Sequence, residues 1–349
     1  MTDPVAPPEG TPLLEVEDLS VVFRGRQGTM AGLLGEKTKD ARAVDGVDLQ
    51  VGRGEIVALA GESGCGKTTL ARAILGLVPP STGRIKLDGT EVPQGHRALR
   101  KFRRRVQLVF QDPAGTLDPR QTVYEAVAEG IRNQALPGDE EKRVRDALSQ
   151  AGLRPPDRFY LRFPHELSGG QRQRVIIAGA LALQPDLIVA DEPVSALDAS
   201  VRGEILRLLL ELREQRGLAL LIVTHDLGVA WMVADRVAVM YLGRIVEVGR
   251  TEAVLTNPQH PYTRSLLSVV PETKHVAPMV LSGEAPDPTR IPSGCRFHPR
   301  CPMVADGTAA AAGIEERCRN EDPSLAGTEH EVACHLVDAP APRATPAGS

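Results

Sequence analysis

The chain of 349 residues is 42% hydrophobic and 25% charged, and its formal net charge is −4. This composition is typical of a globular protein with a sizeable core, and the length allows one large domain or two smaller ones. Six Phe, four Tyr and one Trp give few rings for base stacking. Since the net charge is not basic either, we expect no nucleic-acid partner.

Apolar runs are short throughout the chain. The longest, residues 175–183, is far shorter than a segment that spans a bilayer. Residues 1–12 are rich in Pro and lack the basic and apolar parts of a signal peptide, and residues 338–349 are rich in Pro and Ala. We expect both ends to be disordered and the protein to be cytoplasmic.

The predicted elements alternate between strands and helices. Residues 13–23 alternate apolar and polar side chains like a half-buried strand, and residues 25–40 have the composition of a loop. Short apolar runs predict further strands at residues 55–60, 84–87, 106–110, 187–190 and 219–223. Helical spacing predicts helices at residues 67–77, 168–183 and 201–212, and two more within residues 122–152. This order predicts an α/β core with right-handed crossovers. From about residue 251, Pro, His and Cys become frequent, which indicates a second, smaller domain.

A phosphate-binding motif occupies residues 61–68, Gly-Glu-Ser-Gly-Cys-Gly-Lys-Thr. It fits the pattern GxxxxGK followed by Ser or Thr, and it lies between a predicted strand and a predicted helix, as the pattern requires. The glycines let backbone N–H groups surround phosphates at the positive end of the helix. Lys67 would reach the β- and γ-phosphates and the Thr68 hydroxyl would ligate Mg²⁺. A chance match within a Gly-rich turn is the alternative.

Two further segments extend this site. An apolar strand carries Asp191 and Glu192 at its carboxyl end, where open α/β sheets bind ligands. Asp191 could hold the Mg²⁺ shell and Glu192 could accept a proton from an attacking water. Residues 167–171, Leu-Ser-Gly-Gly-Gln, begin a helix with Ser168 as its N-cap and leave amides open to an anion.

In this order, the phosphate loop, the LSGGQ segment and the acidic strand resemble the nucleotide-binding subunit of an ATP-binding cassette (ABC) transporter. The resemblance covers residues 13–250. It implies a P-loop NTPase core with a helical subdomain at about residues 120–175, followed by a small Cys-containing C-terminal domain at residues 251–337. It also implies ATP hydrolysis with Glu192, His225, Lys67 and Gln111 as catalytic residues, and Mg²⁺ held by Thr68, Gln111 and Asp191.

The same resemblance assigns the ATP contacts. Phe23 matches the adenine-stacking position and Asp198 the D-loop, while Cys65 is interpreted as a small residue packed inside the phosphate loop. Phe23 could alternatively be a core residue. The implied ATP-binding residues are Phe23, Gly61, Ser63, Gly64, Cys65, Gly66, Lys67, Thr68, Thr69, Gln111, Ser168, Gly169, Gly170, Gln171, Asp191 and Asp198.

In this family, two cassettes enclose ATP in a head-to-tail arrangement, so the segment at Ser168 would face the phosphate loop of a second subunit. The resemblance implies a second ABC ATPase as the partner in a heterodimer, two transmembrane permease subunits and an extracytoplasmic solute-binding protein. The chain would then lie at the cytoplasmic face of the cell membrane as a peripheral subunit.

Segments 163–174, 192–200 and 257–267 are typical of oligopeptide and dipeptide importers, and the insertion after Phe23 resembles the F-type ATPase subunit of those systems. Four late cysteines support this branch, in which such cysteines can ligate a 4Fe–4S cluster. They are Cys295, Cys301, Cys318 and Cys334, with the spacing C-x5-C-x16-C-x15-C. From spacing alone, four thiolates suit zinc equally, and unligated thiols are the third alternative.

We therefore interpret the chain as an ATPase subunit that energises import of peptides or similar small solutes. Two alternatives stay open. One is an ABC ATPase acting in translation or repair without a membrane partner, although such proteins carry two cassettes or long coiled coils. The other is a regulatory ATPase whose cysteines sense metal or redox state.

Overall fold

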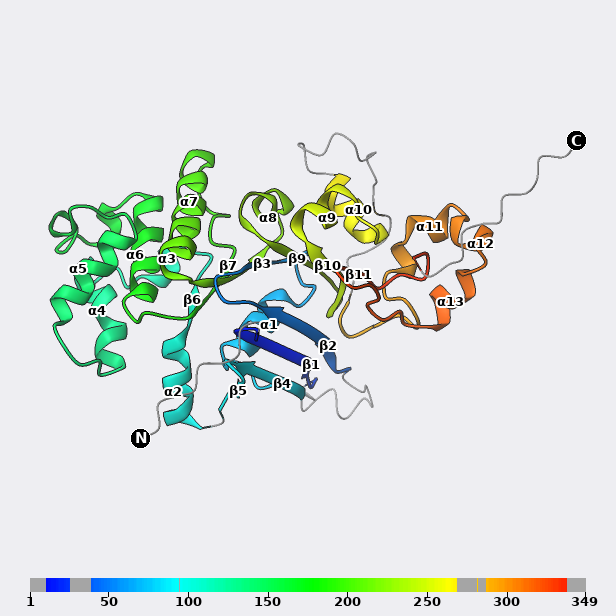
Figure 1. The fold of residues 1–349 in the computed structure, drawn as a ribbon, viewed down its shortest axis with the longest axis horizontal. Coiled ribbons are helices and arrows are strands. Elements are labelled where there is room, and N and C mark those ends of the chain that lie inside the picture. The colour runs from blue at the N-terminus through cyan, green and yellow to red at the C-terminus, as the bar shows by residue number, and fades with distance from the viewer. Residues whose placement is uncertain (1–10, 26–38, 94, 269–280, 282–286, 338–349) are drawn as a thin grey trace, which may run out of the picture.

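The structure is a computed structural model that describes residues 11–25, 39–93, 95–268, 281 and 287–337. Most of the loop expected at residues 25–40, and the ends expected to be disordered, lie outside this part of the chain. The described residues form two sheets, a helical region beside the larger sheet, and a C-terminal region at its other edge (Figure 1).

The larger sheet has seven strands in the order β11-β10-β9-β3-β8-β7-β6. Its centre is parallel, whereas β10 pairs antiparallel with both of its neighbours. These strands are β3 (Ile56–Ala60), β6 (Val106–Val109), β7 (Leu187–Asp191), β8 (Ala219–Thr224), β9 (Arg236–Tyr241), β10 (Arg244–Arg250) and β11 (His330–Val332). β3, β6, β7 and β8 confirm the strands expected from the apolar runs.

The smaller sheet is antiparallel, in the order β2-β1-β4-β5. Its strands are β1 (Leu14–Phe23), β2 (Ala41–Val51), β4 (Thr82–Leu87) and β5 (Thr90–Glu91). Helix α1 (Lys67–Ile74) lies between the two sheets (Figure 1). Leu187 and Val189 of β7 face this layer, while Ile188 and Ala190 face the helical region. A strand buried on both faces therefore reads as a continuous apolar run.

The helical region contains α4 (Val123–Asn133), α5 (Glu140–Gln150) and α6 (Gly169–Leu181), which pack on one another. Polar side chains cap all three helices at their N-termini: Thr122 and Ser168 form capping boxes, and Asp139 accepts from the backbone of Lys142. Two short 3₁₀ turns, η2 (Pro156–Arg158) and η3 (Pro164–Glu166), connect α5 to α6. The two helices expected within residues 122–152 and the helix expected from residue 168 are confirmed.

Other helices cover the sheet. α7 (Ala199–Arg216), α8 (Leu227–Val233), α9 (Thr251–Thr256) and α10 (Pro261–Ser268) lie on the face opposite α1 (Figure 1). Helices α2 (His96–Arg105) and α3 (Pro113–Thr116) flank β6 in the chain. The patterns above did not predict α2, β2 or the β9–β10 hairpin.

The C-terminal region continues the main sheet. It contains η4 (His298–Arg300), α11 (Pro302–Ala305), α12 (Thr308–Ala311), α13 (Glu315–Asn320) and β11. The carboxylate of Glu247 in β10 is fully buried and accepts from the backbone N–H groups of Gln259 (2.7 Å) and His260 (3.1 Å), and its Oε1 lies 2.7 Å from His330 Nε2. Three segments, which are β10, the turn before α10 and β11, therefore meet at one buried carboxylate.

Candidate active site

The phosphate loop joins β3 to α1, and its glycines hold conformations that other residues rarely adopt. Gly61 has φ of 153° and Gly66 has φ of 113°. A Cβ atom on Gly61 would overlap the carbonyl oxygen of Met240, and one on Gly66 would overlap that of Ala43. Glycine is therefore required at both positions by backbone conformation and by the close approach of neighbouring strands.

The Lys67 ammonium bridges the loop. Its Nζ donates to the carbonyl oxygens of Gly61 (2.7 Å) and Glu62 (2.8 Å), and the residue is only 6% exposed. The Cys65 thiol is buried beside it, and burial raises the pKa of that thiol. Cys65 therefore packs inside the loop, as the sequence indicated.

Two carboxylates face the loop from the carboxyl end of β7. Burial raises the pKa of Asp191, and a hydrogen bond with Thr68 acts in the opposite direction. Glu192 has φ of 48°, a left-handed conformation that is uncommon for a residue with a side chain. Strained conformations of this kind are concentrated at functional sites.

The Glu192 carboxylate contacts two side chains from other segments. Gln111 Nε2 donates to its Oε2 (3.0 Å), and His225 Nδ1 lies 2.9 Å from its Oε1. A carboxylate held by an amide and an imidazole, beside a phosphate-binding loop, can accept a proton from a water that attacks a phosphoryl group.

These groups surround one open cavity of about 740 Å³. Of the residues expected to bind ATP or catalyse its hydrolysis, the cavity brings together Gly61, Ser63, Gly64, Gly66, Lys67, Thr68, Thr69, Gln111, Asp191, Glu192 and His225. Ala43, Glu62 and Leu266 also line it. No motif role indicated Ala43 or Leu266, and Glu62 occupies a variable position of the phosphate-loop pattern.

Several expected contacts lie outside this cavity. Phe23 is 47% exposed at the end of β1, so it is not a core residue. The segment from Ser168 to Gln171 begins α6, where the Ser168 hydroxyl accepts from the N–H of Gln171 (3.2 Å). Asp198 precedes α7 and lies outside the cavity too. In the described part of the chain, the cavity therefore brings together only some of the residues expected to bind ATP.

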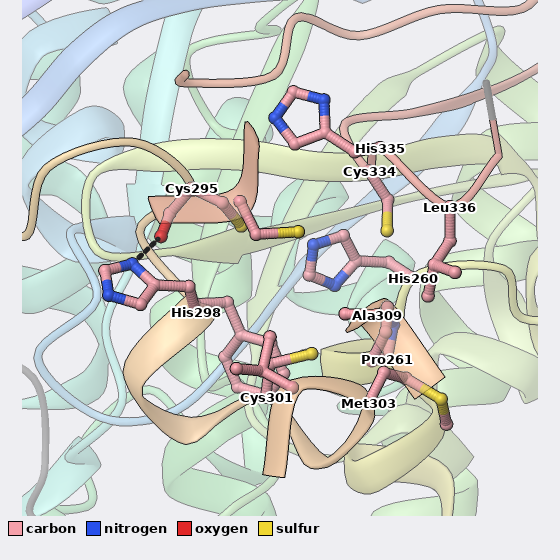
Figure 2. Close-up of a pocket in the computed structure, with 13 residues that line it drawn as sticks. His260, Pro261, Cys295, His298, Cys301, Met303, Ala309, Cys334, His335 and Leu336 are labelled. Atoms are coloured by element: carbon pink, nitrogen blue, oxygen red, sulfur yellow. Dashed lines mark hydrogen bonds between the residues drawn. The ribbon is translucent and has the colours of Figure 1, made fainter. Parts of the chain in front are cut away.

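The four late cysteines line a second, apolar pocket of about 20 Å³. Figure 2 shows the sulfurs of Cys295, Cys301 and Cys334 directed into this space, and Cys318 lines it as well. Burial raises the pKa of the Cys295 thiol to about 12 and that of the Cys334 thiol to about 11. Four thiols are the donors that an iron–sulfur cluster or zinc would use. Yet no three Cys, His, Asp or Glu side chains in the described part of the chain are arranged to hold a metal ion. The geometry therefore gives the cluster and the zinc predictions no support beyond the gathering of the thiols.

Two families match the chain. The family described as "ABC transporter" matches residues 44–195, and the one described as "Oligopeptide/dipeptide transporter, C-terminal region" matches residues 246–307. None of the helices in the described ranges is long and apolar enough to cross a bilayer.

Relatives and solved structures agree with these matches. A Brucella ovis protein named as a peptide import ATP-binding protein is 45% identical over 305 residues, which cover 86% of this chain and 92% of that protein. The oligopeptide transport ATP-binding protein OppF of Escherichia coli is 42% identical over 339 residues, 93% of this chain and 96% of OppF. The dimeric, post-hydrolysis structure of the ATP-binding cassette MJ0796 with ADP and Pi is similar with a TM-score of 0.59 at 30% identity, covering 68% of this chain and 98% of that one. The chain therefore belongs to the family of ABC transporter ATP-binding proteins, in the group that carries the oligopeptide/dipeptide transporter C-terminal region.

Proposed function

We propose that the chain hydrolyses MgATP to drive the import of peptides or similar small solutes through an ABC transporter. One observation carries this proposal: Gln111 and His225 both contact Glu192, and all three line the same cavity as the phosphate loop. The names of the relatives, which refer to peptide import and oligopeptide transport, support the class of solute. A translation, repair or metal-sensing ATPase is not favoured by these relatives.

Each catalytic residue has a defined task in this proposal. The amides of the phosphate loop and the Lys67 ammonium bind the β- and γ-phosphates, and Thr68, Asp191 and Gln111 are the residues that would hold Mg²⁺. When bound, Mg²⁺ supplies positive charge to the phosphate oxygens. Glu192 takes the proton of the attacking water while Gln111 and His225 fix its carboxylate, and His225 also faces the γ-phosphate.

We further propose that a second cassette completes the ATP-binding site. The exposed Ser168, with Gly169, Gly170 and Gln171, lies away from the cavity of its own chain. The capping box uses the N–H groups of Ser168 and Gln171, so Ser168, the amides of Gly169 and Gly170, and Asp198 are the groups that would face a partner's nucleotide, and the MJ0796 cassette is described as dimeric. Phe23, exposed at a strand end, is the proposed adenine platform.

Membership of this family supports a proposal for the transporter assembly. We propose a heterodimer with a second ABC ATPase, docked on two permease subunits at the cytoplasmic face of the membrane and served by an extracytoplasmic solute-binding protein. Residues 13–250 would be the ATPase domain, with its helical subdomain at about residues 120–175, and residues 251–337 the C-terminal domain.

Uptake of labelled peptides tests the function. A strain that lacks this chain should lose uptake of labelled dipeptides and oligopeptides but keep uptake of the free amino acids. The wild-type chain should restore peptide uptake, whereas a Glu192→Gln chain made at the same level should not. Full restoration by Glu192→Gln would contradict hydrolysis as the energy source.

We propose, finally, that Cys295, Cys301, Cys318 and Cys334 ligate a 4Fe–4S cluster, and the shared pocket supports this assignment. A cluster bound there would act as a covalent cross-link between the segments that carry these cysteines. Anaerobically purified protein should contain about four irons and four sulfides per chain, with visible charge-transfer absorption.

The fifth cysteine provides the control for this measurement. Cys301→Ser should lower the iron content severalfold, whereas Cys65→Ser, in the phosphate loop, should retain it. One zinc per chain would establish the zinc alternative, and absence of both metals would establish unligated thiols.

A further inference from the structure

The phosphate loop carries a carboxylate of its own. Glu62 lies directly after Gly61 and lines the nucleotide cavity. An unpaired negative charge at this position would repel a triphosphate, because charges a few ångströms apart interact strongly near a protein surface. The structure therefore needs a means of neutralising Glu62.

Arg300 of the C-terminal region supplies the opposite charge. Its Nη1 donates to Glu62 Oε2 (2.8 Å) and its Nη2 to Glu62 Oε1 (3.3 Å), a bidentate ion pair between residues 238 positions apart. The Arg300 side chain is only 12% exposed and that of Glu62 is 28% exposed. Bidentate, partly buried pairs of this kind have fixed geometry.

The same segment of the loop has a second support. The backbone N–H of Glu62 donates to the hydroxyl oxygen of Tyr262 (2.8 Å), a fully buried residue of α10. The Tyr262 ring packs edge-on against Tyr241 (4.6 Å between centroids) and tilts against Phe297 (5.4 Å). The backbone and the side chain of Glu62 are thus both held by residues beyond position 251.

We propose that Arg300 is a positioning residue of the ATP site, which neutralises and orients Glu62 so that the phosphate loop presents amides and Lys67 to the triphosphate without a competing free carboxylate. This inference rests on the proposed ATPase function and adds that nucleotide affinity depends on the C-terminal region. Arg300 does not line the nucleotide cavity, so its effect is exerted through Glu62.

Charge rescue tests this role in the full-length chain. The dissociation constant for Mg²⁺ and the non-hydrolysable ATP analogue AMP-PNP should rise about 5–20-fold in Arg300→Ala, because Glu62 becomes unpaired. In the double variant Glu62→Gln/Arg300→Ala it should return to within about threefold of wild type, because no free charge is left. Arg300→Lys should be intermediate, since lysine restores the charge without the bidentate geometry.

Further measurements separate this role from a general loss of structure. The rise in the dissociation constant caused by Arg300→Ala should become smaller as the salt concentration increases from about 0.05 to 0.5 M, because salt screens the repulsion between the phosphates and a partly exposed carboxylate. The fall in kcat for ATP hydrolysis should be smaller than the rise in KM. Arg319→Ala breaks an ion pair with Glu315 within α13, away from the loop, and should leave the dissociation constant unchanged.

The outcomes are distinct. Unchanged affinity in Arg300→Ala, or a double variant as weak as Arg300→Ala, would overturn the role of Arg300. Failure of the wild-type chain itself to bind Mg²⁺ with AMP-PNP would instead overturn the proposed ATPase function.

Discussion

Glu192→Gln is expected to lower the rate of ATP hydrolysis by about 10²–10³-fold while leaving the dissociation constant for MgATP within about threefold of wild type. Glutamine keeps the size of the side chain and can still hydrogen-bond to Gln111 and His225. It cannot accept the proton of the attacking water at neutral pH. The phosphate contacts of the loop and of Lys67 stay in place, so binding is retained.

Single-turnover hydrolysis and equilibrium binding measure the two quantities separately. Glu214→Gln, at an exposed position of α7, makes the same chemical change away from the cavity and should leave both unchanged. Turnover at the wild-type rate in Glu192→Gln would show that another group takes the proton.

The second large effect is expected for Lys67→Met. Methionine keeps an unbranched apolar stem at this buried position but removes the ammonium that bridges the Gly61 and Glu62 carbonyl oxygens. Because the same ammonium would pair with the β- and γ-phosphates, we expect the dissociation constant for MgATP to rise about 10²-fold and hydrolysis to fall at least as far.

Lys86→Met is the matched control. Lys86 lies in β4, pairs with Glu17 of β1 and does not line the nucleotide cavity, so its loss should alter nucleotide binding little. Thermal unfolding of both variants would show whether either is folded less stably. Wild-type affinity in Lys67→Met would remove Lys67 from the binding site.

Much of the central fold could be predicted from the sequence because its signals are local. The strands β3 and β8 are buried throughout and β7 is buried up to Asp191, so they read as apolar runs, and the capped helices α4 to α6 carry their own start signals. The missed elements lack such signals. Helix α2 has seven basic side chains among its ten residues and buries only Phe102, so no apolar period marks it.

The β9–β10 hairpin was missed for a different reason. Its two-residue turn is Leu242-Gly243, with φ of 43° and 83°, and a leucine in the first position conceals a turn that usually contains Asn or Asp. The apolar residues on both sides therefore read as one undivided stretch. Tertiary contacts decide the conformation there, because the Leu242 side chain is buried in the core.

The candidate site also contains residues that a local motif predicts and contacts between distant segments that it does not. The phosphate loop is a contiguous motif, so its chemistry follows from eight residues read in order. The contacts of Glu192 with Gln111 and His225 join segments 81 and 33 positions apart, and only resemblance to a family brought them together in advance. The pairing of Glu62 with Arg300 joins residues 238 positions apart, and no local pattern indicates it.

The buried Glu247 limits how this protein could exchange parts with its relatives. Its carboxylate accepts hydrogen bonds from the backbone N–H groups of residues 259 and 260 and contacts His330. A chimera in which a relative supplies everything after residue 250 must therefore reproduce both the turn before α10 and the strand β11. A graft that omits them would leave a charge inside the protein without partners, and would leave β10 as a bare edge open to aggregation. Chimeras of family members should therefore tolerate exchange of the helical region more readily than a junction near residue 251, where the composition of the sequence changes.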